Sequence, residues 1–262
     1  MTPARLRSRV HPRHHVTLHG HPPITMAAVL LRSRLVLPAI VVAFSVLALL
    51  AWRNDGSALR TWDLPVQHWA EGHRGDDVST FFLGASQLGG LVFITLGLGT
   101  LLYVVYRRCH ALGVVLLSAA FARPALEWAL KELVGRPRPD FERLVPGLGP
   151  SFPSGHVMAA VALWGLVPAV VALVTHRRRL WWASVGVSGA AVALVAASRI
   201  YLGVHWLSDV VGALLLGTLY LLGVEYLLDW HHERSGCAPL DVAEAGLQTK
   251  GTNTRPGDGP PA

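Results

Sequence analysis

Long apolar runs constrain this chain more than any other feature of its sequence. The first run covers residues 35–52, lies between Arg34 and Arg53, and contains no charged side chain. A helix of about 20 apolar residues is long enough to cross the hydrocarbon core of a bilayer. Five further runs have a similar length, so we expect six membrane spans, at residues 35–52, 81–106, 110–130, 157–175, 180–197 and 206–228.

The composition fits a membrane protein and excludes two other classes. Of the 262 residues, 52% are hydrophobic and 15% are charged, whereas a soluble domain is typically about 25% charged. A chain this apolar is not disordered throughout. Its two cysteines, Cys109 and Cys237, are too few for a disulfide framework or a thiolate metal site. We therefore predict an all-α fold, a six-transmembrane-helix bundle that covers residues 35–230.

Polar segments flank and interrupt the predicted spans. Residues 1–34 are rich in Arg, His and Pro, and we expect them to form a disordered basic tail. Met26 is an alternative start of the chain. We expect no metal site at the five histidines of this tail. Residues 231–262 end in a stretch dense in Gly, Pro and Thr, which predicts a flexible tail. Trp62 and Trp69 lie in a polar stretch after the first span, and such spacing indicates a short amphipathic helix on the membrane surface.

The distribution of arginines predicts the orientation. Short loops rich in Lys and Arg face the cytoplasm, and here six arginines precede the first span, two follow the second and three follow the fourth. Both termini of this multi-pass protein of the cell membrane are therefore expected in the cytoplasm. The loops after the third and fifth spans then face outward. They break the rule, because five cations lie at their borders: Lys131, Arg136, Arg138, Arg143 and Arg199.

Three short segments at these outward-facing ends contain most of the ionisable residues that border the spans. They are residues 131–139 (KELVGRPRP), residues 153–156 (PSGH) and residues 198–209 (SRIYLGVHWLSD). Because the spans alternate in direction, all three segments lie on the same face of the membrane. We therefore expect them to form one site.

The cations and the helix start in these segments favour phosphate as the ligand. Lys131, Arg138 and Arg199 supply fixed positive charge, and the planar guanidinium of Arg suits phosphate oxygens. Ser154 and Gly155 lie where a helix is expected to begin. The free N–H groups and the positive dipole end of a helix start bind anions.

The histidines of the same segments favour nucleophilic and acid–base chemistry. His205 and Asp209 are four residues apart at the start of a predicted helix, so they share one face. A carboxylate at this position fixes the imidazole tautomer and leaves the other ring nitrogen free as a nucleophile. His156 is a candidate general acid, because an unperturbed histidine titrates near neutral pH. Each segment alone has an ordinary explanation as a loop, a helix cap or a surface pair, but together they favour a functional site.

The three segments resemble the signature of a known family. The patterns K-x6-R-P, P-S-G-H and S-R-x5-H-x3-D are similar to those of the type 2 phosphatidic acid phosphatases, the membrane branch of a superfamily that includes the vanadium haloperoxidases. With the six spans, the resemblance covers about residues 35–230. It implies a bundle with its active site at the outer membrane–water boundary, and hydrolysis of lipid phosphomonoesters or lipid pyrophosphates without a metal or other cofactor.

The resemblance also implies a role for each site residue. His205 attacks phosphorus, Asp209 orients His205, and His156 protonates the leaving oxygen. We expect membrane lipids and a lipid phosphate substrate as partners, and no nucleic acid. Phosphatidic acid, phosphatidylglycerol phosphate and polyprenyl pyrophosphate are all candidate substrates. The residues expected to bind the phosphoryl oxygens are Lys131, Arg138, Ser154, Gly155 and Arg199.

Three other functions fit parts of the pattern. A lipid phosphotransferase passes the same phosphohistidine to an alcohol or a sugar. A non-catalytic lipid-phosphate binder or transporter needs the cations, but it does not need the pair of His205 and Asp209 beside His156. A soluble vanadate-dependent oxidase does not fit a chain with six spans.

One further set of charges lies on the third predicted span. Arg123, Glu127 and Lys131 recur every four residues, so they share one helix face. Our hypothesis is that Glu127 pairs with Arg123 or Lys131 and holds Lys131 toward the phosphate. The alternative is that Arg123 extends along the helix to a membrane boundary.

Overall fold

The computed structural model describes residues 35–53, 57–108, 110–175 and 177–235. Within these residues the protein is all-helical, as predicted, and no β-strand is present. Residues 1–34 and 236–262, which the sequence predicts to be tails, lie outside the described residues. The helices are α2 (Val36–Arg53), α3 (Ser57–Gly72), α4 (Asp76–Gln87), α5 (Leu91–Arg108), α6 (His110–Val134), α7 (Gly155–Thr175), α8 (Arg178–Tyr201) and α9 (Leu207–Ser235).

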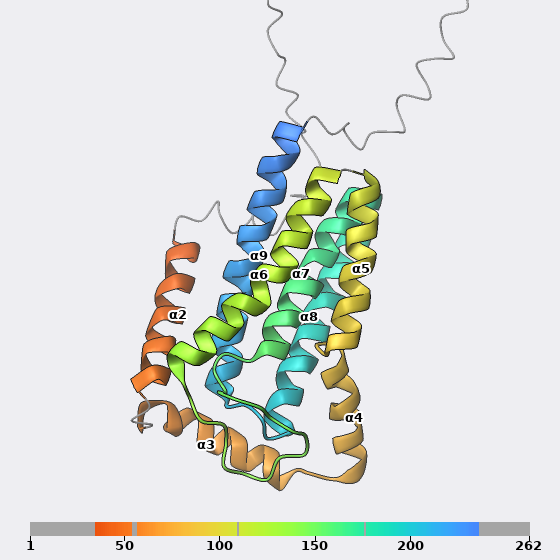
Figure 1. Ribbon diagram of the computed structural model, residues 1–262. Helices are drawn as coiled ribbons and strands as arrows, with labels where there is room; N and C mark the ends of the chain where they lie inside the picture. Colours follow the sequence, from red (N-terminus) through yellow and green to blue (C-terminus); the bar gives the residue numbers. More distant parts are fainter. Residues whose placement is uncertain (1–34, 54–56, 109, 176, 236–262) are drawn as a thin grey trace, which may run out of the picture.

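The long helices form a bundle with α7 at its centre. Helices α5 to α9 run beside one another, α2 lies along one side, and α3 and α4 lie at one end (Figure 1). Helix α7 packs against α5, α8 and α9. Its residues Val157 and Met158 are fully buried in one cluster with Val195 of α8 and Ala213 of α9. A helix that is apolar on all sides is expected at such a central position.

One predicted span is divided in the structure. The sequence predicts a single span over residues 81–106, but α4 ends at Gln87 and α5 begins at Leu91. A Cβ atom at Gly89 would lie 2.7 Å from the backbone oxygen of His156 and 2.7 Å from Cγ1 of Val195. Only glycine allows the chain to pass so close to α7 and α8. The apolar pattern continues through the break and therefore does not reveal it.

The polar stretch between the first two predicted spans is helical, as expected. Helix α3 turns Asp63 and Gln67 toward the bundle, where both are about 1% exposed, while Trp62 is 72% exposed and Trp69 is 62% exposed. Residues 63 and 67 share a face because they are four apart. The outward tryptophans are typical of a helix at a membrane surface, and this location of α3 stays a prediction.

Three described helical segments are long and apolar enough to cross a membrane, judged by length and composition. They are α2, α8 and residues Leu207–Leu228 of α9, and shorter apolar stretches occur at Ile94–Tyr103 in α5 and Gly155–Val171 in α7. The all-helical class is confirmed, and the count of six spans stays a prediction. The predicted end of the bundle at residue 230 differs from the structure, because α9 continues to Ser235.

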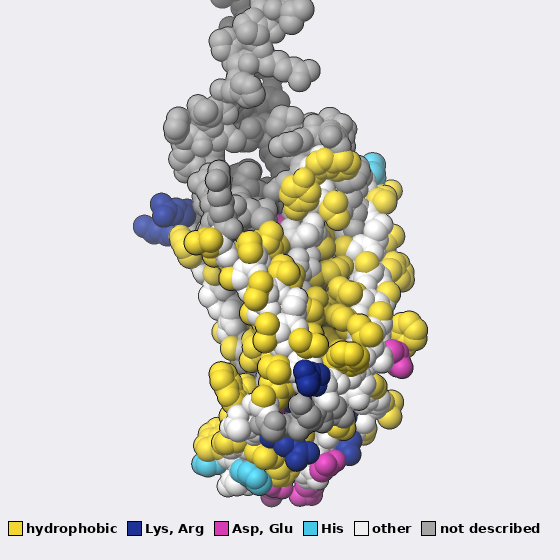
Figure 2. Space-filling view, turned by 90° about the vertical axis from the view of Figure 1, so that its left-hand side faces the viewer, with side chains coloured by type: hydrophobic (Ala, Val, Ile, Leu, Met, Phe, Trp, Pro, Cys, Tyr) yellow, Lys and Arg dark blue, Asp and Glu magenta, His cyan; other side chains and the backbone are white. Residues whose placement is uncertain are grey.

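The surface separates an apolar flank from a charged end. Figure 2 shows hydrophobic side chains along the height of the described helices, while charged and histidine side chains gather at the lower end, near α3 and α4. The exposed apolar side chains of the described helices include Leu96 of α5, which is 68% exposed, and Phe121 of α6, which is 71% exposed. An exposed apolar surface of this extent indicates contact with a membrane or with another protein.

Candidate active site

The three charged segments of the sequence meet at the end of the bundle where α3 and α4 lie (Figure 1). Helix α6 ends there, α7 begins there, and residues 202–206 connect α8 to α9. Backbone hydrogen bonds join the segments, since the N–H of Ser154 donates to the Asp209 carbonyl at 3.3 Å and that of Ser151 to the Arg136 carbonyl at 2.8 Å. The structure thus brings the segments together as expected, and the role of each residue stays a prediction.

His205 and Asp209 are buried side by side. Nδ1 of His205 lies 3.5 Å from Oδ2 of Asp209, and catalytic hydrogen bonds are often this long before a substrate binds. Oδ2 also accepts a hydrogen bond from the N–H of Trp206 at 2.9 Å. The other ring nitrogen, Nε2, lies 3.4 Å from Nη1 of Arg138. The ring therefore has one nitrogen beside the carboxylate and the other beside a cation expected to bind phosphate.

Backbone carbonyls hold the guanidinium of Arg138. Nη1 donates to the carbonyl of Val204 at 2.7 Å. Nη2 donates to that of Leu148 at 2.7 Å, and Nε donates to that of Gly149 at 3.0 Å. These carbonyls belong to the loops before α9 and before α7. The side chain therefore fixes two of the three segments relative to each other.

Glu127 lies between two cations and against the start of α7. Its Oε2 accepts a hydrogen bond from Nη1 of Arg123 at 2.8 Å, and its Oε1 lies 3.6 Å from Nζ of Lys131. The predicted pairing is therefore confirmed with both cations. A Cβ atom at Gly155 would lie 2.0 Å from Oε1 of Glu127, so any larger residue would displace the Glu127 carboxylate from this position.

Three buried polar atoms of the predicted site have no hydrogen-bond partner among the described residues. They are Oγ of Ser154, Nε of Arg199 and Nδ1 of His205, which faces Asp209 at 3.5 Å. Arg199 is held from its other side, because Nη1 donates to Oγ of Ser86 at 2.6 Å. A buried polar group left unpaired costs roughly 1–3 kcal/mol. Oγ of Ser154, two residues before His156, and Nε of Arg199 therefore have hydrogen-bonding capacity that the described residues do not use.

Sequence reasoning missed a buried charge network behind Asp209. Nη1 of Arg136 donates to Oδ1 of Asp209 at 2.6 Å and to Oγ of Ser208 at 2.6 Å. Nη2 of Arg136 donates to Oδ2 of Asp63 at 2.7 Å. The Ser208 hydroxyl donates to the same Asp63 oxygen at 2.7 Å, and its N–H donates to Oδ1 of Asp63 at 2.8 Å. The sequence shows Arg136 as a misplaced cation, but no spacing connects it to Asp63.

The environment of His205 favours the neutral imidazole. Burial lowers the pKa of His205 from 6.5 to about 4, together with the positive charges of Arg138 and Arg199 and against the raising effect of Asp209. Burial disfavours the charged form of a histidine because water no longer solvates it. At neutral pH the ring therefore has a free nitrogen lone pair, as a nucleophile requires.

The ionisable side chains are arranged for an anion. Among the described residues, no group of three or more His, Cys, Asp or Glu side chains is placed to hold a metal ion. The two carboxylates nearest the predicted phosphate-binding residues are paired with cations, Asp209 with Arg136 and Glu127 with Arg123. The positive charge of the predicted phosphate-binding residues that these carboxylates do not neutralise therefore favours an anionic ligand.

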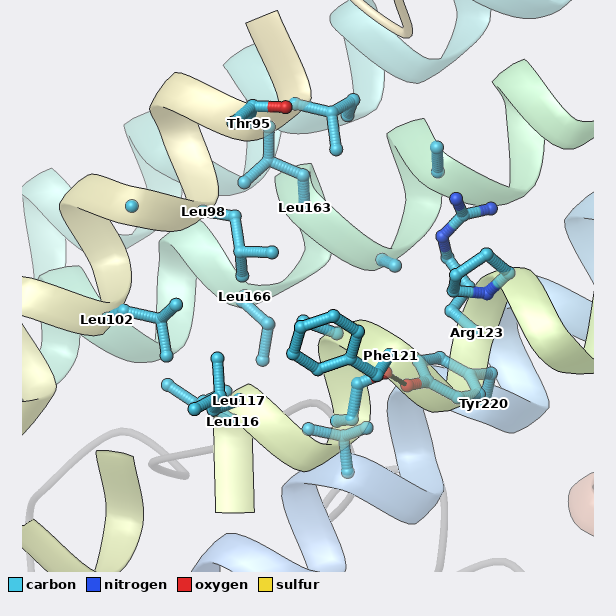
Figure 3. Close-up of a pocket in the computed structure, with 18 of the residues that line it drawn as sticks. Thr95, Leu98, Leu102, Leu116, Leu117, Phe121, Arg123, Leu163, Leu166 and Tyr220 are labelled. Carbon is cyan, nitrogen blue, oxygen red and sulfur yellow. Dashed lines mark hydrogen bonds between the residues drawn. The ribbon is translucent and has the colours of Figure 1, made fainter. Parts of the chain in front are cut away.

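An apolar cavity lies beside the charged residues. It has a volume of about 490 Å³ and is lined by residues of α5, α6, α7 and α9, including Leu98, Leu116, Leu163 and Leu166. Figure 3 shows these side chains around the cavity, with Arg123 at one edge. Arg123 is the residue that pairs with Glu127. The cavity therefore borders the ion pairs that lead to Lys131 and to the start of α7.

Comparison with known proteins gives one family and one curated relative. The sequence pattern of the PAP2 superfamily matches residues 111–233. Phosphatidylglycerophosphatase B of Bacillus subtilis (strain 168) is 34% identical over an alignment of 142 residues, which covers 52% of this chain and 66% of the relative. The match thus spans just under two thirds of the relative's length.

Two solved structures share the fold. A crystal structure of a transmembrane PAP2 type phosphatidylglycerolphosphate phosphatase from Bacillus subtilis superposes with a TM-score of 0.66 at 24% identity, covering 84% of this chain and 98% of that one. The Aquifex aeolicus LpxE structure superposes with a TM-score of 0.50 at 23% identity, covering 66% of this chain and 98% of that one. All three charged segments fall within residues 111–233, the part of the chain that matches the PAP2 superfamily.

Proposed function

We propose that this protein is a membrane phosphatase that hydrolyses lipid phosphomonoesters or lipid pyrophosphates through a phosphohistidine. The observation that supports this most directly is the buried pair of His205 and Asp209, with Nε2 of His205 3.4 Å from the Arg138 guanidinium. A binder or transporter of lipid phosphates has no use for a neutral imidazole held by a carboxylate. The curated relative is named a phosphatidylglycerophosphatase, which makes phosphatidylglycerol phosphate the first substrate to test.

In the first step, Nε2 of His205 attacks phosphorus and the bond from phosphorus to the leaving oxygen breaks. Burial and the charge of Arg199 lower the pKa of His156 to about 3 in the free protein, so His156 takes up a proton when the anionic phosphate binds, because a nearby negative charge favours the charged imidazole. His156 then donates this proton to the leaving oxygen, and Asp209 stabilises the positive charge that forms on the His205 ring. Lys131, Arg138 and Arg199 neutralise the charge on the transferring group, as cationic clamps do in other phosphoryl transfers.

In the second step, water attacks the phosphohistidine. His156 removes a proton from the water, the bond between phosphorus and Nε2 breaks, and inorganic phosphate leaves. The mechanism needs no group other than the side chains named and the water. His205 returns to its neutral form, so the enzyme is ready for another turnover.

The apolar surroundings of the site support a lipid as the substrate. The cavity of about 490 Å³ is lined mainly by apolar side chains, eight of them leucine, and borders Arg123. Apolar cavities of this size hold apolar ligands, so a lipid chain placed there would leave its phosphate near the charged end of the bundle. The predicted orientation puts this end on the extracytoplasmic side of the cell membrane.

The test is phosphate release by detergent-purified protein from phosphatidylglycerol phosphate, phosphatidic acid and a polyprenyl pyrophosphate. We expect release in the presence of a chelator and none from His205→Ala protein that remains folded. Activity near that of the wild type in His205→Ala would remove the phosphohistidine from the mechanism. A phosphorylated alcohol in place of free phosphate would identify a phosphotransferase instead.

A further inference from the structure

Asp63 is the acidic partner of the guanidinium that contacts Asp209. It lies on α3, outside residues 111–233, which match the PAP2 superfamily. Its carboxylate is fully buried and makes three contacts, to the N–H of Ser208 at 2.8 Å, to its hydroxyl at 2.7 Å, and to Nη2 of Arg136 at 2.7 Å. Arg136 in turn contacts Oδ1 of Asp209 at 2.6 Å. A continuous chain of charge-assisted hydrogen bonds therefore joins α3 to the carboxylate beside His205.

The charges of this network affect how strongly Asp209 interacts with the His205 ring. Asp63 and Asp209 share the single positive charge of Arg136, so the group has a net negative charge while His205 is neutral. In the proposed reaction the His205 ring becomes positive when Nε2 bonds to phosphorus, and Asp209 faces its Nδ1. Without Asp63, the whole charge of Arg136 would act on Asp209 and would weaken its interaction with the charged ring.

From this geometry we infer that Asp63 is a positioning residue for the proposed reaction, which acts through Arg136 and Ser208 to keep Asp209 placed beside His205 and to offset the charge of Arg136, so that Asp209 interacts more strongly with the charged ring. The inference rests on the proposed function for its effect on turnover, because it concerns a residue that does not touch the substrate. The alternative is that Asp63 only anchors α3 to the end of the bundle. An anchor contributes to stability but not to the rate of a folded molecule.

The first experiment compares Asp63→Asn with Asp77→Asn, a control on the exposed first turn of α4. We expect kcat of Asp63→Asn per folded molecule to fall about tenfold or more, as is typical when a residue that orients a catalytic ligand is replaced. KM should stay within about twofold of the wild type, because substrate binding does not involve Asp63. The control should behave as the wild type. An unchanged kcat per folded molecule would overturn the inference.

A second variant covers the case in which Asp63→Asn does not fold. Ser208→Ala removes the hydroxyl that connects Asp63 and Arg136, and both ionic partners remain. It should lower kcat several-fold without raising KM. Wild-type kcat in folded Ser208→Ala protein would count against the inference in the same way.

A readout that does not depend on turnover separates this inference from the proposed function. The ¹⁵N chemical shift of Nδ1 in His205 reports its interaction with Asp209, and it should move in Asp63→Asn and Ser208→Ala but not in Asp77→Asn. A signal that does not move would overturn the role of Asp63 even in an active phosphatase. A signal that moves in a protein without phosphatase activity would support the role of Asp63 and reject the proposed function.

Discussion

At the scale of single residues, the site depends on charges that are buried and matched. His205 is buried beside Asp209, and Asp209 is buried beside Arg136. A buried charge is tolerated only when a partner and hydrogen bonds compensate for the loss of water. The same rule explains why the imidazole stays neutral, because burial and the positive charges of Arg138 and Arg199 outweigh the effect of Asp209.

The titration of His205 tests this account. Its pKa is lowered to about 4, so the ring should stay neutral at pH 5.5, where an exposed histidine is mostly protonated. The unfolded chain takes up this proton near pH 6.5, so the contribution of His205 to stability should fall as the pH drops from about 6.5 to 4. NMR of ¹⁵N-labelled histidine, assigned with His205→Ala, measures the midpoint. A midpoint near 6.5 would contradict the account.

The ion pairs of Glu127 lead to a second prediction. Glu127→Gln keeps the shape of the side chain but removes the charge that holds Nζ of Lys131 at 3.6 Å. We expect inorganic phosphate to inhibit the variant roughly three- to tenfold more weakly, the loss of about 1 kcal/mol of positioning. Glu132→Gln, on the exposed side of the same helix, is the matched control. Equal inhibition constants in all three proteins would exclude a positioning role for Glu127.

At the scale of helices, the sequence predicts some features of the site well and others not at all. The four-residue spacing of Glu127 with Lys131 places that pair correctly, because both residues lie on α6 and the helix sets the distance. His205 and Asp209 are also adjacent, but His205 lies before α9, which begins at Leu207, so the loop sets their distance as well. The network of Asp63 and Arg136 could not be predicted, because the two residues are 73 positions apart and only the packing of α3 under the bundle joins them. The break at Gly89 was missed because the residues on both sides of it are equally apolar.

That break can be tested by adding one methyl group. Gly89→Ala would place Cβ 2.7 Å from the backbone oxygen of His156, and overpacking of this kind costs roughly 1–3 kcal/mol. Gly84→Ala is the control, because a Cβ atom at Gly84 meets nothing within 4 Å. Thermal unfolding in detergent should show a lower midpoint for Gly89→Ala and an equal or higher midpoint for Gly84→Ala. Equal midpoints for both variants would show that the close approach to α7 is not needed.

At the scale of the whole molecule, the charged end of the bundle is predicted to face away from the cytoplasm. The test uses a protein with both native cysteines replaced by serine. Cysteine introduced at Leu148, which is 88% exposed beside the site, should react with a membrane-impermeant maleimide in intact cells. Cysteine at the exposed Arg178, on the opposite end, should react only after the membrane is opened. The reverse pattern would place the site in the cytoplasm.

The salt bridge between Asp63 and Arg136 has a practical consequence for protein engineering. A minimal catalyst cut to residues 111–233 would retain all three charged segments and the whole match to the superfamily, yet it would lose α3. Arg136 would then remain buried with one acidic neighbour instead of two, and removing one partner of a buried ion pair typically costs about 3–5 kcal/mol. Anyone who trims or transplants this scaffold should therefore retain the short amphipathic helix.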